Sequence, residues 1–418
     1  MRNSTIRAVN RLATRWAMQA PAGDAGTVHA AAGVWPLLAL LADGAAGPAR
    51  DELAQSLGLP ARAAAGAARE LLAALADVRG LQTATGLWTR AEVPLDDVWS
   101  AKLPAGARGT LTGVPDADGK VLDTWAAERT GGLIEHVPVS WPEDTRLVLA
   151  SALALRVRWA APFKEAKEAK EAKKVNRTNE AKGPNGASAV EAEGPWAGRA
   201  LRRLSRTTSS LDDVRVAGGP AGAVTVLEVA GTEDVDVHLL LGGERTPPRE
   251  VLATGLAVVT GDAPSVAGNA LPDGTPGPGL AIRTVVTYVP GDLLSVSTVA
   301  FALRTEHDLL DHAPLFGLES ATDETSAHFP GISSEPLAIG SAQQAATARF
   351  HAAGFEAAAV TAVLARPGTG APPRGKHRVR RAEVRIDRPF GFLAVHRASR
   401  LVLAAGWVTE PETTAPEG

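Results

Sequence analysis

The chain of 418 residues contains no cysteine. Disulfide scaffolds, thiol catalysis and cysteine-based zinc sites are therefore excluded. No uninterrupted apolar run approaches the roughly 20 residues of a membrane-spanning helix. Lys and Arg number 43 against 46 Asp and Glu, so the overall charge favours neither nucleic acid nor a membrane surface as a partner.

Common catalytic motifs are also missing: there is no Gly-x-Ser-x-Gly elbow and no His-Glu-x-x-His pair. His307 and Asp311 lie four residues apart within "EHDLLDH". They would either bind a metal or form the polar face of an amphipathic helix over residues 305–318, and the helix is the favoured interpretation. We therefore expect no enzyme activity, no metal and no cofactor.

One strongly basic run, Arg374–Arg381, could contact a polyanion such as nucleic acid or a glycan. No aromatic residues are interleaved with it, so base stacking is not supported. The favoured interpretation is a solvated strand edge guarded by charge.

The first 21 residues intersperse Arg with apolar residues, which is typical of an amphipathic helix rather than a secretory signal. A cytoplasmic location is the resulting expectation, with secretion by an unrecognised route as the alternative. Abundant Ala and Gly, and Arg in excess of Lys outside one short repeat, suggest a GC-rich genome.

Helical patterns come first along the chain, and many non-consecutive strands follow, which indicates an α+β protein. The expected helices cover residues 1–21, 31–44, 47–58, 61–78, 119–137 and 305–318. The expected strands cover residues 81–93, 145–159, 224–229, 234–242, 280–289 and 293–304, with a final strand pair over 377–397 and 400–411. Residues 164–195 repeat the triplet KEA three times and then turn rich in Asn, Gly and Glu, so they predict a disordered, solvated insertion.

The stretch "GFEAAAVTAV", Gly354–Val363, is rich in small residues and precedes a long Pro/Gly loop. It resembles the reactive-loop hinge of the serpin family, a Gly-Thr-Glu-Ala-Ala-Ala-Ala-Thr pattern. The hinge then comprises Gly354, Phe355, Glu356, Ala357, Ala358, Ala359, Val360 and Thr361. All of these match the family pattern except Phe355 and Val360.

Further motifs of the same family occur in the correct order along nearly the whole chain, residues 164–195 excepted. The C-terminal signature is matched by Pro389, Phe390, Phe392, Gly406, Val408 and Pro411. A helix over the main sheet is matched by Trp125, Thr130, Gly132 and Ile134, and the top of a long strand by Trp159 and Phe163. The chain is identified on these residues as a divergent serpin of a bacterial, actinobacterial type.

The resemblance implies one domain over residues 1–418, with three β-sheets, about nine helices and an exposed reactive-centre loop over residues 354–378. It implies a monomeric suicide substrate whose loop a serine protease cleaves, after which the loop inserts into the central sheet. Counting from Gly354, the scissile bond is expected at Gly368–Thr369, which favours elastase-like or subtilisin-like proteases. If the scissile bond lay elsewhere, Arg374 or Lys376 would instead be the residue that a trypsin-like protease recognises.

Two departures keep a non-inhibitory binding or scaffold serpin open as the alternative. Phe355 stands where a small polar residue is usual, which predicts slow insertion. The polar cluster under the opening sheet, the shutter, is also altered. Its positions, with the neighbouring breach at the top of the sheet, correspond to Ala30, Gly33, Ser151, Trp159 and Gln344. Ser151 and Gln344 could still hydrogen-bond, although the family's usual polar network is not preserved.

Overall fold

The computed structural model describes residues 1–19, 26–137, 139, 145–165, 195–196, 198–323, 325–355 and 376–414. These residues form three β-sheets, as the resemblance implies, and eight α-helices against the nine or so expected. The helices are α1 (Asn3–Ala17), α2 (Ala31–Gly44), α3 (Gly47–Leu57), α4 (Ala61–Ala76), α5 (Asp97–Ala101), α6 (Pro115–Thr130), α8 (Pro248–Thr260) and α9 (Ala313–Phe316). None of the helices in the described ranges is long and apolar enough to cross a membrane.

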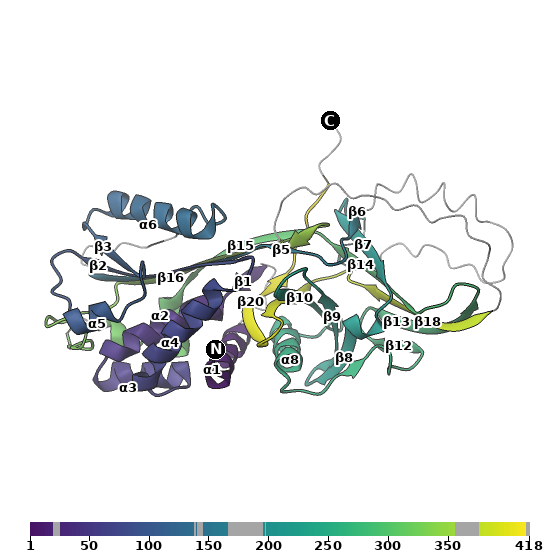
Figure 1. Ribbon diagram of the computed structural model, residues 1–418, viewed down its shortest axis with the longest axis horizontal. Helices are drawn as coiled ribbons and strands as arrows, with labels where there is room; N and C mark the ends of the chain where they lie inside the picture. The colour runs from purple at the N-terminus through teal and green to yellow at the C-terminus, as the bar shows by residue number, and fades with distance from the viewer. Residues whose placement is uncertain are drawn as a thin grey trace.

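The central sheet carries the candidate site. It runs in the order β3-β2-β4-β16-β17-β5, and β15 pairs with the other edge of β16. Its strands are β2 (Leu81–Arg90), β3 (Arg108–Leu111), β4 (Leu147–Leu155), β5 (Val157–Arg158), β15 (Phe301–Asp308), β16 (Ser341–Phe350) and β17 (Gly354–Phe355). Helix α6 lies on one face of this sheet and α2 to α4 lie on the other (Figure 1). Every residue of β4 is buried, as in a strand covered on both faces.

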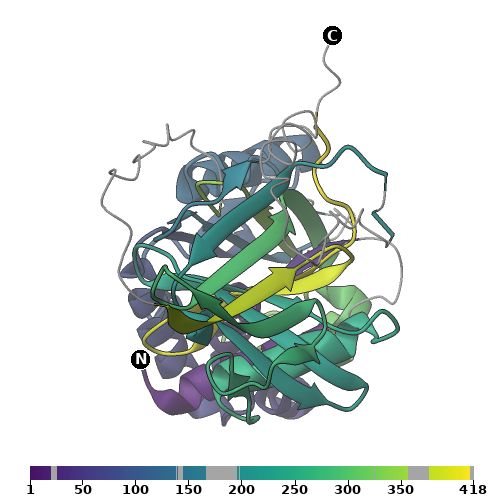
Figure 2. The ribbon, with the colours of Figure 1, turned by 90° about the vertical axis from the view of Figure 1, so that its right-hand side faces the viewer.

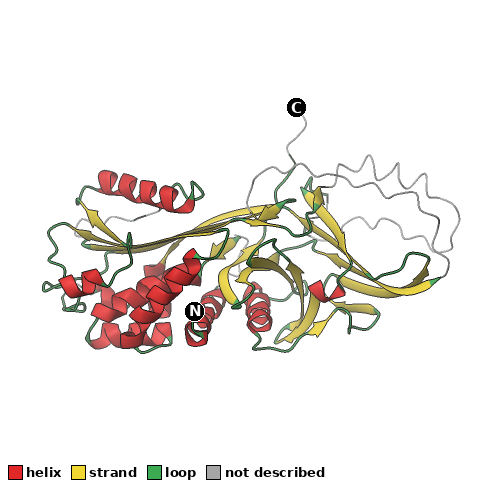
Figure 3. Cartoon of the chain, in the orientation of Figure 1, coloured by secondary structure: helices red, strands yellow, loops and turns green. Residues whose placement is uncertain are grey.

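The remaining strands form the other half of the molecule (Figures 2 and 3). One sheet contains β1 (Thr27–His29), β20 (Leu401–Val408), β19 (Phe390–His396), β10 (Val235–Leu241), β9 (Gly222–Val229), β8 (Val214–Gly219) and β11 (Val266–Ala267), in that order. The third sheet contains β12 (Gly274–Gly277), β13 (Leu280–Thr287), β18 (His377–Arg385), β14 (Leu293–Val299), β7 (Arg203–Thr208) and β6 (Lys164–Glu165). Three 3₁₀ turns are η1 (Leu211–Asp213), η2 (Leu309–His312) and η3 (Ser320–Thr322).

The prediction of an amphipathic helix over residues 305–318 is wrong. Its first four residues complete β15, which pairs with β16 from Phe301 opposite Phe350 to Asp308 opposite Gln343. A 3₁₀ turn follows, and only Ala313–Phe316 are α-helical. Pairing with a strand distant in sequence has overridden the local helical pattern.

The prediction of a final strand pair over residues 377–397 and 400–411 is also wrong. Residues 377–408 form three strands, β18, β19 and β20. From His377 onward the basic run is not a strand edge. Strand β18 lies inside its sheet, antiparallel to β13 and parallel to β14. The Arg380 side chain is bound within the protein, because its guanidinium donates hydrogen bonds to the carbonyls of Gly268, Asn269 and Leu271.

The expected insertion over residues 164–195 lies mostly outside the described residues. Its first two residues are not disordered, because Lys164 and Glu165 pair with Ser205 and Leu204 of β7. Trp196, directly after the segment, is buried and donates from Nε1 to the carbonyl of Thr409 at 3.0 Å.

Candidate functional site

The central sheet is closed at one end and parted at the other. Strands β4 and β16 pair in parallel from Val148 opposite Ser341 to Leu153 opposite Ala346. Beyond that point the two strands separate, and β17 lies between β16 and β5, antiparallel to both. The first two hinge residues are therefore already part of the sheet.

Gly354 fits its place because it has no side chain. It lies opposite Arg158, and a Cβ atom at this position would stand 2.2 Å from the carbonyl oxygen of Val157. Backbone atoms of a paired strand cannot move aside without breaking the pairing. The close approach of β17 and β5 therefore requires glycine.

Phe355 lies opposite Val157 on one side and Phe350 on the other. Its side chain is 1% exposed, and its ring centroid lies 5.9 Å from that of Phe392 in β19. The core thus accommodates the large ring at the second residue of β17. That the Phe355 ring slows insertion of the rest of the loop into the sheet stays a prediction.

The turn between β16 and β17 is fixed by hydrogen bonds from the segment after β5. Trp159 donates from its backbone to the carbonyl of Ala353 at 3.1 Å and from Nε1 to that of His351 at 2.9 Å. Phe163 donates from its backbone to Ala352 at 2.8 Å. Trp159 thus lies beside β17, at the parted end of the sheet. The acceptors are backbone carbonyls, which is why no residue pattern pointed to them.

The structure brings the predicted shutter positions together beneath the paired part of the sheet. Gln344 Oε1 accepts from the backbone of Ala30 at 2.8 Å, and Gln344 Nε2 donates to the same residue's carbonyl at 2.9 Å. A Cβ on Gly33 would stand 2.6 Å from Ser151 Oγ. No hydrogen bond joins Ser151 to Gln344, because Ser151 Oγ is buried and has no partner among the described residues.

This arrangement predicts opposite outcomes for two substitutions. Gln344→Ala leaves the buried N–H of Ala30 without a partner and removes one of the two hydrogen bonds to its carbonyl, which still accepts from Gly33. It should lower the free energy of unfolding by about 1–3 kcal/mol. Ser151→Ala removes an unpaired buried hydroxyl and should leave that free energy unchanged or raise it by up to about 1 kcal/mol. Denaturant titration of both variants checks this, and a strongly destabilised Ser151→Ala variant would contradict the geometry.

A buried histidine lies beside the shutter. His29, next to Ala30, stacks against Trp16 with ring centroids 4.8 Å apart and lies 6.4 Å from the ring of His307. Burial, with a smaller contribution from the charge of His307, lowers the pKa of His29 to about 3. His307 lies opposite Gln344, and its Nε2 is 2.8 Å from the carbonyl oxygen of Val28.

The depressed pKa of His29 predicts a loss of stability in acid. Between pH 6.5 and pH 3 the unfolded chain binds a proton here that the folded chain does not, so stability falls as the pH falls through this window. The contribution is about 2 kcal/mol between pH 7 and pH 5. Denaturant titrations at the two pH values should show a smaller fall for His29→Gln than for the natural chain. Equal falls would contradict the assignment.

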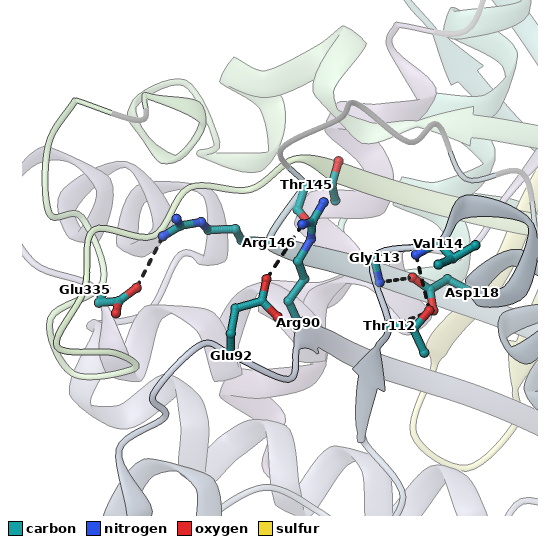
Figure 4. A network of polar contacts seen from close by, with 9 residues as sticks. All are labelled: Arg90, Glu92, Thr112, Gly113, Val114, Asp118, Thr145, Arg146 and Glu335. Carbon is teal, nitrogen blue, oxygen red and sulfur yellow. Dashed lines mark hydrogen bonds and ion pairs between the residues drawn. The ribbon is translucent and has the colours of Figure 1, made fainter.

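Polar contacts fix the closed end of the sheet (Figure 4). Arg90 Nε donates to the carbonyl of Thr145 at 2.8 Å, which ties β2 to the chain entering β4. The buried carboxylate of Asp118 accepts from the backbone N–H groups of Thr112 and Gly113 at 2.8 and 2.9 Å, which fastens α6 to the end of β3. The strands are thus fastened at the end opposite β17.

Other predicted positions fall outside the described residues. These are Glu356, Ala357, Ala358, Ala359, Val360, Thr361, Gly368, Thr369 and Arg374. Within the described part of the chain, no group of three or more His, Asp or Glu side chains is placed to hold a metal ion.

Comparison with known families places these features in context. The family description "Serpin (serine protease inhibitor)" matches residues 7–182 and 294–411, well over half of the chain. Plasma protease C1 inhibitor of Rattus norvegicus is 42% identical over 52 residues, which is 12% of this chain and 10% of that protein. Putative serpin-Z8 of Oryza sativa subsp. japonica is 32% identical over 157 residues, 34% of this chain and 35% of that protein. The matches thus span at most about a third of these relatives' own lengths.

Solved structures agree over almost the full chain. Thyroxine-binding globulin in complex with thyroxine aligns with a TM-score of 0.68 at 16% identity, covering 98% of this chain and 99% of that one. Serpin48 of Tenebrio molitor aligns with a TM-score of 0.65 at 18% identity, covering 98% of both chains. Native protease nexin-1 with heparin gives 0.66 at 15% identity, again covering 98% of both. At these identities the likeness concerns the fold.

Proposed function

This chain belongs to the serpin family, and from that premise we propose that it inhibits a serine protease as a suicide substrate. The family consists of non-enzymatic inhibitors and binders, so the chain is not an enzyme. The observation that carries the proposal is β17. Two hinge residues, Gly354 and Phe355, are paired between β16 and β5, at the head of the path that a cleaved loop would follow.

The register of β17 predicts where the rest of the hinge would lie after cleavage. Each step along the hinge moves one residue back along β16 and one back along the chain of β5 and β4. From Phe355 opposite Phe350 and Val157, six further steps bring Thr361 opposite Gln344 and Ser151. Those two residues are themselves paired across β16 and β4, so both sides of the gap give the same register.

The side chains along this path suit insertion. Alternation along a strand would direct Ala357 and Ala359 to the same face as Phe355, towards the core. Small side chains there limit steric conflict as β4 and β16 part. Thr361 would then arrive beside Ser151 Oγ, the buried hydroxyl that has no partner in the described structure. Insertion would give this hydroxyl a hydrogen-bond partner, which favours the inserted state.

The target is proposed to be an elastase-like or subtilisin-like serine protease, from the Gly368–Thr369 bond. The experiment incubates the protein with elastase, subtilisin, chymotrypsin and trypsin and separates the products on denaturing gels. The same proteases with the active-site serine blocked are the control. We expect an SDS-stable complex with an active protease and a large rise in melting temperature of the cleaved chain. Loop cleavage that gives neither result would contradict inhibition.

A non-inhibitory binding serpin is the second candidate, and the burial of Phe355 favours it. A ring held against Phe392 anchors the start of the loop and could keep the intact chain in its present state. The same experiment separates the two functions. A binding protein would be cleaved without trapping the protease.

A further inference from the structure

Strand β1 is a three-residue strand that joins the central sheet to its neighbour. Its residues Thr27–His29 pair with β20 at one edge of their own sheet. Side chains of β15, from the central sheet, hold its middle residue. Val28 donates from its backbone to Thr305 Oγ1 at 3.0 Å, and its carbonyl accepts from His307 Nε2 at 2.8 Å. Few contacts therefore keep β1 in place.

Gln344 connects β1 to the paired part of the central sheet. Its amide is hydrogen-bonded to both backbone groups of Ala30, the residue directly after β1. It also lies opposite His307 on one side and opposite Ser151 of β4 on the other. Release of β1 with Ala30 would therefore remove a fastening from the part of the sheet where β4 and β16 are paired.

Two histidines face each other at this junction in apolar surroundings. The His29 side chain is 2% exposed, and its Nε2 has no hydrogen-bond partner among the described residues. Trp16 of α1 contacts both His29 and His307, with ring centroids 4.8 and 5.2 Å apart, and Phe316 packs against Trp16 at 4.9 Å. A proton on either imidazole would create a charge away from water. Protons on both would place two like charges at the 6.4 Å separation of the rings.

No ion pair joins either ring to a carboxylate in the part of the chain that the structure describes. The titratable group that faces His29 is His307, and His312 of η2 acts on His307; each of them opposes protonation of its neighbour. Glu306 and Asp308, which flank His307, alternate to the other face of β15. The neighbours from the other elements are uncharged, namely Ala13 and Trp16 of α1, Gln344 of β16, Ala405 of β20 and Phe316 of α9.

We propose that the His29–His307 pair is a pH-sensitive latch, in which protonation releases β1 and Ala30 from the central sheet. Release exposes the rings to water, which solvates the charge. The latch is separate from the reactive loop and does not depend on the proposed protease inhibition.

The expected size of the response follows from His29. Burial, with a smaller contribution from the charge of His307, lowers the pKa of His29 to about 3 in the closed state, whereas the released strand regains a value near 6.5. At pH 5 the released His29 therefore binds a proton that the closed one does not. Between pH 7 and pH 5 the released state should become about 25-fold more populated relative to the closed state.

Hydrogen exchange of the whole chain, measured by mass spectrometry at pH 7 and pH 5, tests the latch. The rates are corrected for the intrinsic exchange rate at each pH. Peptides that contain residues 27–30 should show an opening constant about 25-fold larger at pH 5. Local opening responds little to low urea, whereas unfolding of the whole chain is promoted by it. Exchange of residues 27–30 should therefore be unaffected by about 1 M urea, while that of β9 and β10 should rise.

Variants then assign the response to the pair. His29→Phe keeps an aromatic ring beside Trp16, and His307→Gln keeps an amide donor for the Val28 carbonyl. The double variant should retain less than about a twofold change between the two pH values. His238→Gln is the matched control, because His238 is also buried, in β10, and burial lowers its pKa to about 4. This control should keep the full response of residues 27–30.

Two results would overturn the proposal. One is a double variant whose residues 27–30 keep the pH response of the natural chain. The other needs no variant: it is exchange of residues 27–30 at pH 5 that rises with urea as steeply as that of β9 and β10, since release would then occur only by unfolding of the whole chain.

Discussion

Replacing Gly354 by valine should abolish the rise in melting temperature that follows loop cleavage. A Cβ at this position would stand 2.2 Å from the Val157 carbonyl oxygen, well inside van der Waals contact. The valine side chain would therefore expel β17, and the hinge could no longer begin to fill the gap between β5 and β16. Differential scanning calorimetry of the intact and cleaved variant measures this directly.

The control for this experiment is Gly218→Val. Gly218 is exposed in β8, and a Cβ there would meet nothing within 4 Å. This variant should keep the full rise in melting temperature after cleavage. A Gly354→Val chain that is stabilised by cleavage as strongly as the control would contradict the role assigned to β17.

Replacing Phe355 by alanine should lower the free energy of unfolding of the intact chain by roughly 3 kcal/mol, as for other buried Phe truncations. The ring is 1% exposed and packs against Phe392, so its loss leaves a cavity between the central sheet and β19. Denaturant titration measures the change. Phe355→Leu, which keeps most of the apolar volume, should lose less than about 1.5 kcal/mol. An alanine variant as stable as the natural chain would show that the ring does not anchor the hinge.

Phe355→Thr separates anchoring from obstruction. If the ring also slows insertion, the threonine variant should be less stable when intact and yet form more covalent complex with the protease. Unchanged complex formation would remove Phe355 as an argument against inhibition.

The fold could be predicted from the sequence because many of its signals are local, and the hinge stays a prediction. The apolar composition of residues 145–159 predicts a strand, and the structure has β4 and β5 within this range. The hinge is marked by consecutive small residues. Ala30, Ser151 and Gln344 were aligned by motif order, and they lie close together in the structure, while their role as a shutter stays a prediction.

Other features depend on contacts between segments distant in sequence. Residues 305–308 look helical, and only pairing with β16 makes them a strand. The basic run in β18 looks like an exposed edge, and only its neighbours β13 and β14 place it inside a sheet. Gln344 bonds to backbone groups of Ala30 rather than to Ser151, and backbone groups carry no residue signature.

The central claim is that the cleaved loop enters the sheet in the register set by β17, and the absence of cysteine makes it testable by cross-linking. In that register, extended from Phe355 opposite Phe350, position 358 of the cleaved chain would lie opposite Thr347, with both side chains on the face of the sheet away from Phe355. Directly opposite residues in antiparallel strands have Cα atoms about 4.5–5.5 Å apart, within the range for a disulfide. The test pair is Thr347→Cys with Ala358→Cys, and the control pair is Thr347→Cys with Ala357→Cys, whose side chains would point to opposite faces.

Thiol titration in denaturant, after mild oxidation, is the measurement. The account predicts two free thiols in the intact test protein and none once a protease has cut the loop beyond Thr361. The control pair should keep both thiols in either state. Two free thiols in the cleaved test protein, or equal loss of thiols in the control, would contradict insertion in this register.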